Sequence, residues 1–221
     1  KKASEDFYGF LRFNGYWLED YALFMALKDA NGGKCWLEWE EGLKNRHYDA
    51  IEAAKVQYAD DIMFYKALQY HFFKQWRDLK EYANSNDVEL IGDIPIYVAL
   101  DSVDVWASKE LFQLDENNNP SVVAGCPPDG FSATGQLWGN PVYDWEYHKK
   151  TDYSWWKKRL SHNAKLYDII RIDHFRAFAD YYTIPYGSPD AKSGKWERGV
   201  GMHFWNKMKP VLEDTLIIAE D

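Results

Sequence analysis

Residues 167–175 read Tyr-Asp-Ile-Ile-Arg-Ile-Asp-His-Phe and carry the strongest fold signal in the chain. The run is almost continuously apolar, which is typical of a strand buried on both faces in a parallel sheet. Two further runs have the same character: Val-Glu-Leu-Ile-Gly-Asp-Ile-Pro-Ile-Tyr-Val at 88–98 and Leu-Ile-Ile-Ala-Glu-Asp at 216–221. We therefore expect three parallel strands, each buried on both faces.

Helical patterns precede the second and third of these strands, at about 153–166 and 203–212. Strands that alternate with helices predict βαβ units with right-handed crossovers. The predicted fold class is α/β, as part of a (β/α)8 TIM-type barrel. A full barrel takes about 250 residues, so the barrel is expected to be incomplete in this chain of 221 residues.

The N-terminal part is predicted to be helical. Apolar side chains recur at spacings of three and four between residues 7 and 27, and Gly32-Gly33 offers a stop. A second helical stretch at 49–84 predicts one long helix or two in series. We interpret 1–86 as a mainly helical insertion and 87–221 as the β/α part, with both in a fragment of one catalytic domain (1–221).

Composition excludes several classes of protein. A formal net charge of -9 argues against nucleic-acid or anionic-membrane partners, and no apolar run is long enough to span a bilayer. There is no signal-peptide pattern. Cys35 and Cys126 stand in unrelated contexts and indicate neither a disulfide framework nor a zinc site. A reduced, cytoplasmic setting is expected.

A long segment at 113–145 is rich in Asn, Pro and Gly, and it is predicted to be an active-site loop. It contains four large aromatic residues, which favours order over disorder. The whole chain is 18% aromatic with 11 Trp. Most of these rings should fill the core, but Trp and Tyr also suit a surface that stacks on sugar rings.

Acidic residues stand at the end of each predicted strand: Asp93, Asp173 and Glu220. Because side chains two apart share a face, Arg171 and Asp173 point the same way. In a barrel the C-terminal strand ends form the floor of the active site. The pattern therefore predicts a cluster of carboxylates with one guanidinium.

Two carboxyl groups of unequal pKa can divide the roles of nucleophile and general acid, as in a retaining glycosidase. Arg171 is expected to keep Asp173 ionised, while Glu220, crowded by carboxylates, is expected to hold its proton. Taken singly, each acid could equally be a helix cap or an ion-pair partner. A carboxylate-bound divalent metal on an unrelated barrel is a weaker alternative, because no His or Cys spacing supports a transition metal.

Five motifs span the chain in order: Trp17-Leu-Glu-Asp-Tyr-Ala-Leu-Phe-Met-Ala-Leu-Lys28, Gly92-Asp-Ile-Pro-Ile-Tyr-Val98, Ser132-Ala-Thr-Gly-Gln-Leu-Trp-Gly-Asn-Pro141, Arg171-Ile-Asp-His-Phe-Arg176 and Ile218-Ala-Glu-Asp221. With them the sequence resembles the 4-α-glucanotransferases (amylomaltases, or disproportionating enzymes) of the α-amylase clan of glycoside hydrolases. The resemblance implies a retaining, double-displacement transfer of α-1,4-glucan (maltodextrin) segments to an acceptor glucan, without cofactor or metal.

The resemblance also assigns residues. It implies that Asp173 is the nucleophile, that Glu220 is the general acid/base and that Arg171 holds the nucleophile ionised. Asp93 is then part of the polar network near the transferred glucose, and His174 is a neighbouring sugar contact. The residues expected in the loop that folds over the bound glucan are Asp129, Phe131, Ser132, Gln136 and Trp138.

The sequence departs from the family pattern at Gly130, where an aromatic residue is usual, and at Ala177, where Gly is common. The family's third catalytic Asp lies well beyond the acid/base Glu and is absent from these residues. We therefore expect an internal fragment of a glucanotransferase that is inactive alone. Two alternatives stay open: an α-glucan hydrolase of the same clan and a non-catalytic glucan-binding fragment. The oligomeric state is not predicted.

Overall fold

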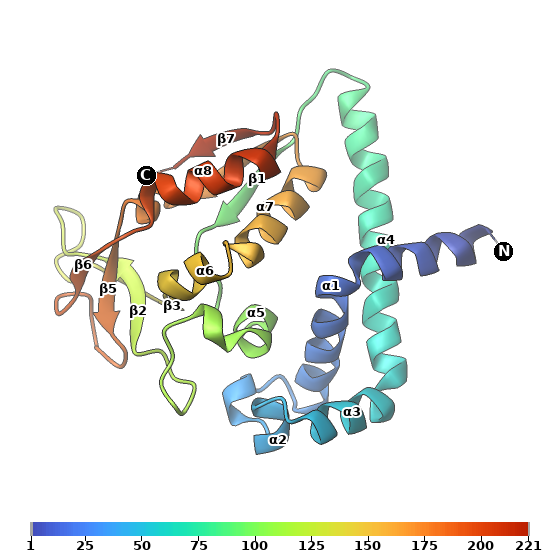
Figure 1. Ribbon diagram of the computed structural model, residues 1–221, viewed down its shortest axis with the longest axis horizontal. Coiled ribbons are helices and arrows are strands. Elements are labelled where there is room, and N and C mark those ends of the chain that lie inside the picture. Colours follow the sequence, from blue (N-terminus) through green and yellow to red (C-terminus); the bar gives the residue numbers. More distant parts are fainter. Residues whose placement is uncertain (1, 221) are drawn as a thin grey trace. The chain divides into compact units, whose positions relative to one another are not determined.

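The computed structural model describes residues 2–220 (Figure 1). The chain forms two compact units, of which one ends at Leu79 and the other begins at Lys80. The helices of the first part are α1 (Lys2–Ala30), η1 (Trp36–Glu38), α2 (Glu41–Lys44), α3 (Tyr48–Gln57) and α4 (Ala59–Asn84). The last of them continues past the boundary between the units.

The predicted first helix is confirmed as α1, and it ends where the glycines begin. The N–H of Gly33 bonds to the carbonyl of Lys28 at 2.8 Å, and Gly32 and Gly33 have φ values of 65° and 78°, a conformation that glycine adopts without steric cost. The second helical stretch is two helices in series. Tyr58, with φ -108° and ψ 28°, separates α3 from α4.

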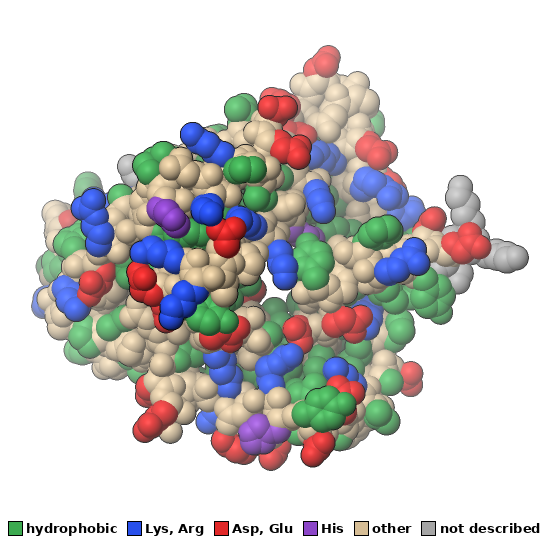
Figure 2. Space-filling view, in the orientation of Figure 1, with side chains coloured by type: hydrophobic (Ala, Val, Ile, Leu, Met, Phe, Trp, Pro, Cys, Tyr) green, Lys and Arg blue, Asp and Glu red, His purple; other side chains and the backbone are tan. Residues whose placement is uncertain are grey.

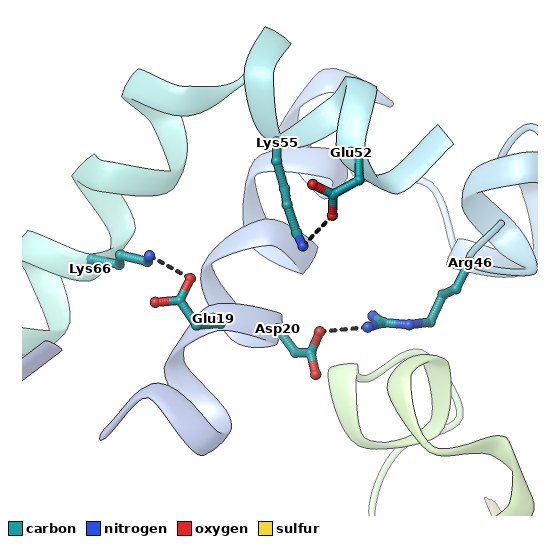
Figure 3. A network of polar contacts seen from close by, with 6 residues as sticks. All are labelled: Glu19, Asp20, Arg46, Glu52, Lys55 and Lys66. Carbon is teal, nitrogen blue, oxygen red and sulfur yellow. Dashed lines mark hydrogen bonds and ion pairs between the residues drawn. The ribbon is translucent and has the colours of Figure 1, made fainter. Parts of the chain in front are cut away.

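Ion pairs join elements of the helical unit (Figure 3). Glu19 on α1 pairs with Lys66 on α4, and Asp20 pairs with Arg46, each at 2.6 Å. Glu19 and Asp20 belong to the motif at 17–28, so that motif contributes here to the packing of helices.

The β/α part contains a parallel sheet in the order β1-β4-β7. Its strands are β1 (Ile91–Pro95), β4 (Ile169–Asp173) and β7 (Leu216–Ala219). This confirms the three predicted strands and their parallel pairing. The predicted helices before β4 and β7 are α7 (Ser154–Leu166) and α8 (Gly201–Leu212), which lie side by side across the sheet in Figure 1.

The prediction that these strands are buried on both faces is wrong. Ile94, Ile170 and Ile172 are buried. The alternate side chains face solvent, and Ile91 and Leu216 are 58% and 63% exposed. Helices cover only one face, so the apolar runs do not mean two buried faces. The acids at the strand ends lie on the uncovered face. Asp93 is two residues after Ile91, and Glu220 is four after Leu216, so each points to the same side as that exposed residue. Asp173 is four residues after Ile169, which pairs with Ile91 and Leu216.

A second, antiparallel sheet has the order β3-β2-β5-β6. Its strands are β2 (Val122–Cys126), β3 (Gln136–Pro141), β5 (Asp180–Pro185) and β6 (Lys195–Arg198). Two of them lie within the segment predicted as a loop, so that part of the prediction is corrected. A small core of Val123, Tyr182, Ile184 and Ala191 packs on this sheet. The short elements α5 (Val103–Ala107), η2 (Lys109–Leu111), α6 (Trp145–Lys150) and η3 (Phe175–Phe178) complete the unit.

Aromatic side chains dominate the core between the helices and the parallel sheet. Trp156 and Phe204 are fully buried and meet edge to face, with ring centroids 5.4 Å apart. Phe178 stacks on Phe204 at 4.6 Å. Among the described residues, however, 14 of the aromatic side chains are buried and 11 are exposed, so the core holds only part of the aromatic excess.

His148 on α6 is fully buried beside Tyr143 and Trp145. Desolvation lowers its pKa to about 4, although the charge of Asp144 and the backbone of Leu111 act in the opposite direction. The unfolded chain then binds this proton more tightly than the folded one, so stability falls as the pH drops below the ordinary histidine pKa.

We expect the free energy of unfolding to fall by about 2 kcal/mol from this group between pH 7 and pH 5. Chemical denaturation of the chain and of His148→Phe at both values tests this. The variant should lose clearly less stability on acidification. An equal loss in both proteins would show that His148 is not held neutral.

Candidate active site

Arg171 links the acids at the ends of the parallel strands. It lies opposite Asp93 in the β1–β4 register. Its Nη1 donates to Asp93 Oδ2 at 2.5 Å, and its Nη2 lies 3.4 Å from Glu220 Oε1. The structure thus brings Asp93, Arg171 and Glu220 together on the uncovered face, with Asp173 at the end of the same strand as Arg171.

The end of β7 is tied to the turn after β4 by backbone groups. The N–H of His174 donates to Glu220 Oε2 at 3.0 Å, and the N–H of Phe175 donates to the Glu220 carbonyl at 2.7 Å. The Glu220 N–H in turn donates to the carbonyl of Ile172 at 3.1 Å. His174 adopts a left-handed conformation with φ 53°, which directs its amide at the carboxylate.

The carboxyl groups of Asp173 and Glu220 share a hydrogen bond. Desolvation, this bond and the charge of Glu220 raise the pKa of Asp173. The His174 amide, the shared bond and Arg171 lower the pKa of Glu220. The expected order of ionisation is therefore wrong for this structure. Burial and Glu220 outweigh the charge of Arg171 at Asp173, since the guanidinium contacts Asp93 and Glu220, and the His174 amide acts most strongly on Glu220.

This arrangement predicts that Asp173 keeps its proton to higher pH than Glu220, the reverse of the ordinary order of Asp and Glu. Carboxyl ¹³C chemical shifts followed from pH 7 to pH 2.5 measure both groups in the 221-residue chain. Because the groups interact, two coupled steps are expected, with Asp173 contributing most to the upper one. An upper step carried by Glu220 would contradict the described geometry.

Trp138 and Gln136 reach this cluster through His174. The indole of Trp138 meets the His174 ring edge to face, with centroids 4.9 Å apart. Its Nε1 donates to Gln136 Oε1 at 2.9 Å, and Tyr97 lies on another side at 6.4 Å. The His174 ring thus joins Trp138 to the end of the parallel sheet where the His174 amide meets Glu220.

The remaining loop residues form a turn of their own. Asp129 Oδ1 accepts from the N–H groups of Phe131 and Ser132 at 2.8 and 2.7 Å. Ser132 Oγ donates to the carbonyl of Gly135 at 2.8 Å. Phe131 is fully exposed. Within residues 2–220, no hydrogen bond or ion pair joins Asp129 or Ser132 to Asp173 or Glu220, so here Asp129 and Ser132 order the turn that presents Phe131.

Three residues that the sequence analysis missed hold the segment after β1. Asn140 Nδ2 donates to the carbonyl of Val98 at 2.9 Å, and Tyr143 Oη donates to that of Ile96 at 2.6 Å. Arg159 on α7 donates to the carbonyl of Pro95 at 2.7 Å.

Only Asn140 could have been found beforehand, because it lies in the 132–141 motif. The roles of Tyr143 and Arg159 depend on tertiary contacts, and no local pattern marks them. Among the described residues, no three His, Cys, Asp or Glu side chains are grouped to hold a metal ion, and no helix is long and apolar enough to cross a membrane.

Comparison with known proteins gives a consistent result. The family model for 4-alpha-glucanotransferase matches residues 1–221. A 4-alpha-glucanotransferase of Clostridium butyricum is 48% identical over 221 residues, which is 100% of this chain and 45% of the relative. That of Solanum tuberosum is 42% identical over 205 residues, covering 93% of this chain and 36% of the relative. The chain thus spans less than half of the length of these relatives.

Solved structures agree with the fold. The amylomaltase from Streptococcus agalactiae in complex with acarbose has a TM-score of 0.95 and 41% identity, over 100% of this chain and 45% of that one. The amylomaltase from Corynebacterium glutamicum has a TM-score of 0.79 at 18% identity, over 100% of this chain and 29% of that one, and it supports the fold alone. The prediction of a partial α/β barrel is confirmed.

Proposed function

The chain belongs to the 4-alpha-glucanotransferase family, and from this premise we propose that its parallel sheet carries the nucleophile and the acid/base of a retaining glucan transfer. The substrates are α-1,4-glucans, as donor and as acceptor, which places the reaction in maltodextrin metabolism. One observation carries the proposal: Asp173 and Glu220 stand at the C-terminal ends of the adjacent parallel strands β4 and β7, and Arg171 lies 3.4 Å from Glu220.

The proposed reaction has two displacements. A carboxylate oxygen of Asp173 attacks the anomeric carbon while Glu220 gives its proton to the departing glycosidic oxygen, which leaves a covalent glycosyl ester and a shortened glucan. The 4-hydroxyl of an acceptor then gives its proton to Glu220 and attacks the same carbon. The ester bond breaks, and Asp173 becomes a carboxylate again. Two inversions retain the anomeric configuration.

The reaction needs Asp173 as a carboxylate and Glu220 with its proton. In the free chain, burial and Glu220 raise the pKa of Asp173, while the His174 amide and Asp173 lower the pKa of Glu220. Retaining enzymes place the two carboxyl groups about 5–5.5 Å apart, with the scissile bond between them. We propose that a bound glucose unit lies between Asp173 and Glu220 and so removes the hydrogen bond that contributes to both shifts.

The aromatic side chains bordering the site supply the glucan contacts in this proposal. Trp138 and His174 line the wall beside the carboxylates, and Phe131 extends from the 129–135 turn. A Cβ atom at position 130 would have no heavy atom within 4 Å, so the turn has room for a larger residue in place of Gly130. The Streptococcus agalactiae structure contains acarbose, and we propose that this chain binds α-1,4-glucans at the corresponding face.

A segment exchange tests the function. The matching segment of the Clostridium butyricum enzyme is replaced by these 221 residues, and the product is incubated with maltotriose. Glucose together with longer oligosaccharides is the expected result. Products that are only shorter would favour an α-glucan hydrolase. A folded chimera that binds maltoheptaose without turnover would favour the non-catalytic alternative. The 221-residue chain by itself should give no transfer, because its catalytic face is open to water.

A further inference from the structure

The turn at residues 174–178, directly after Asp173, is held from several sides. It begins with the left-handed residue His174, a conformation that persists only where the surroundings impose it. The helical turn η3 follows and is closed by the N–H of Ala179, which donates to the carbonyl of Arg176 at 2.8 Å. The N–H of His174 donates to the Glu220 carboxylate, and the N–H of Phe175 donates to the Glu220 carbonyl. Any movement of this turn therefore moves the groups around the acid/base.

The buried side of the turn packs on α8. Phe175 stacks on Trp205 with centroids 4.8 Å apart and planes 15° apart. Phe178 lies against Phe204. These contacts fix the distance of the turn from the core. They do not fix its solvent side, where Arg176 is exposed.

On its solvent side the turn contacts the second sheet through a stack, beside two backbone connections. The chain continues through Ala179 into β5, and the N–H of Gly199 donates to the carbonyl of Ala179 at 2.7 Å. The guanidinium carbon of Arg176 lies 4.3 Å from the ring centroid of Trp196 on β6. Trp196 in turn meets Tyr182, its β5 partner in the register, at 5.4 Å. Tyr182 is buried and its hydroxyl donates to the carbonyl of Ala191 at 2.9 Å. Trp196 is therefore 43% exposed but packs on a buried and hydrogen-bonded Tyr182.

We propose that Arg176 and Trp196 are positioning residues: their stack adds a side-chain contact to the backbone connection between the 174–178 turn and the second sheet, and this contact holds the His174 amide on the Glu220 carboxylate. A planar guanidinium suits this role because it lies flat on an indole, whereas an ammonium is a point charge that can move without losing its hydration. The second sheet, which the sequence analysis missed, then acts on the catalytic acids through this contact. The proposal rests on the proposed function only in treating Glu220 as the acid/base.

The simplest alternative is that the stack of Arg176 on Trp196 stabilises β6 and has no effect on the turn. The two explanations predict different effects of substitutions at 176 and 196 on the pKa of Glu220. The His174 amide is the largest influence that lowers the pKa of Glu220. The charged and titratable groups that face Glu220 are Asp173, Arg171 and His174, and substitutions at 176 or 196 change none of them. A change in the titration of Glu220 then reports the position of the turn.

The experiment uses the 221-residue chain and needs no activity, so it is independent of whether the transfer reaction is correct. The pKa of Glu220 is followed by carboxyl ¹³C shifts, and hydrogen exchange of the His174 and Phe175 amides is measured in the same samples. The variants are Arg176→Lys, Trp196→Leu and Trp196→Phe. The matched control is Glu197→Gln, because Glu197 neighbours Trp196 on β6 and pairs with Lys195 at 2.7 Å.

Arg176→Lys and Trp196→Leu should raise the pKa of Glu220 by about half a unit or more and speed exchange of the two amides by about three- to tenfold, as expected from the loss of one cation–π contact. Trp196→Phe keeps an aromatic face, so it should change the pKa of Glu220 and the exchange of the two amides by less. Glu197→Gln should change neither the pKa nor the exchange rates. Arg176 is exposed, so its lysine variant is expected to keep the dispersed amide spectrum of the folded chain. An unchanged Glu220 pKa and unchanged exchange in that folded variant would overturn the proposal.

Discussion

Replacing Asp173 with Asn is expected to abolish glucan transfer by the Clostridium butyricum enzyme that carries this segment, with kcat/KM falling by at least about 10⁴-fold. An amide cannot form the glycosyl ester that the first displacement requires. It can still donate to Glu220, and the neighbouring contacts of Arg171 with Asp93 and Glu220 do not involve it. The loss should therefore come from chemistry rather than from misfolding. Initial rates of glucose release from maltotriose measure it.

Asp190→Asn is the matched control, because Asp190 is an acid in the same unit whose contacts are local, to Lys192. This variant should keep nearly full activity, and both variants should bind maltoheptaose. Retention of more than about 1% of the transfer rate by the Asp173 variant would be far above the residual activity expected of an enzyme without its nucleophile.

Replacing Trp156 with Ala is expected to lower the free energy of unfolding by about 3–5 kcal/mol. Trp156 is fully buried on α7 and packs against Phe178, which follows β4, and Phe204 on α8. Its removal leaves a large cavity between the two helices that cover the parallel sheet. Urea denaturation of the chain, followed by far-UV circular dichroism, gives the difference.

Tyr186→Ala serves as the control for this loss of stability. Tyr186 is 49% exposed at the end of β5, and its truncation should change the free energy of unfolding by roughly 0.5 kcal/mol. A cost below about 1.5 kcal/mol for Trp156→Ala would mean that the aromatic core collapses around the cavity and does not have the packing described.

The sequence predicted the parallel sheet well, because strand runs and helix spacings are local signals. The acids at 93, 173 and 220 could be placed on one face, since side chains alternate along a strand. The second sheet was only partly open to prediction. β2 is interrupted by Gly125, and β3 contains Asn140 and Pro141, which weakens the strand signal of both. The run Tyr-Tyr-Thr-Ile in β5 is a recognisable strand pattern, but its partners lie far away in the sequence.

The electrostatic expectation failed for a different reason. Sequence proximity favoured a pair between Arg171 and Asp173, but residues two apart on a strand share a face without having to meet. The register places Asp93 directly opposite Arg171, and β7 brings Glu220 alongside. Which of several carboxylates a long side chain contacts depends on cross-strand distances, and no local pattern contains them.

The central claim is that Asp173 and Glu220 act on one anomeric carbon, and trapping of the intermediate tests it most directly. The segment-exchanged enzyme with Glu220→Gln is treated with α-maltosyl fluoride, whose leaving group needs no acid, and its peptides are analysed by mass spectrometry. A maltosyl ester on the peptide that contains Asp173 is the expected result, and the ester should decay when azide is added as an external nucleophile. A maltosyl group on a different residue, or turnover with inverted anomeric configuration and no adduct, would contradict it.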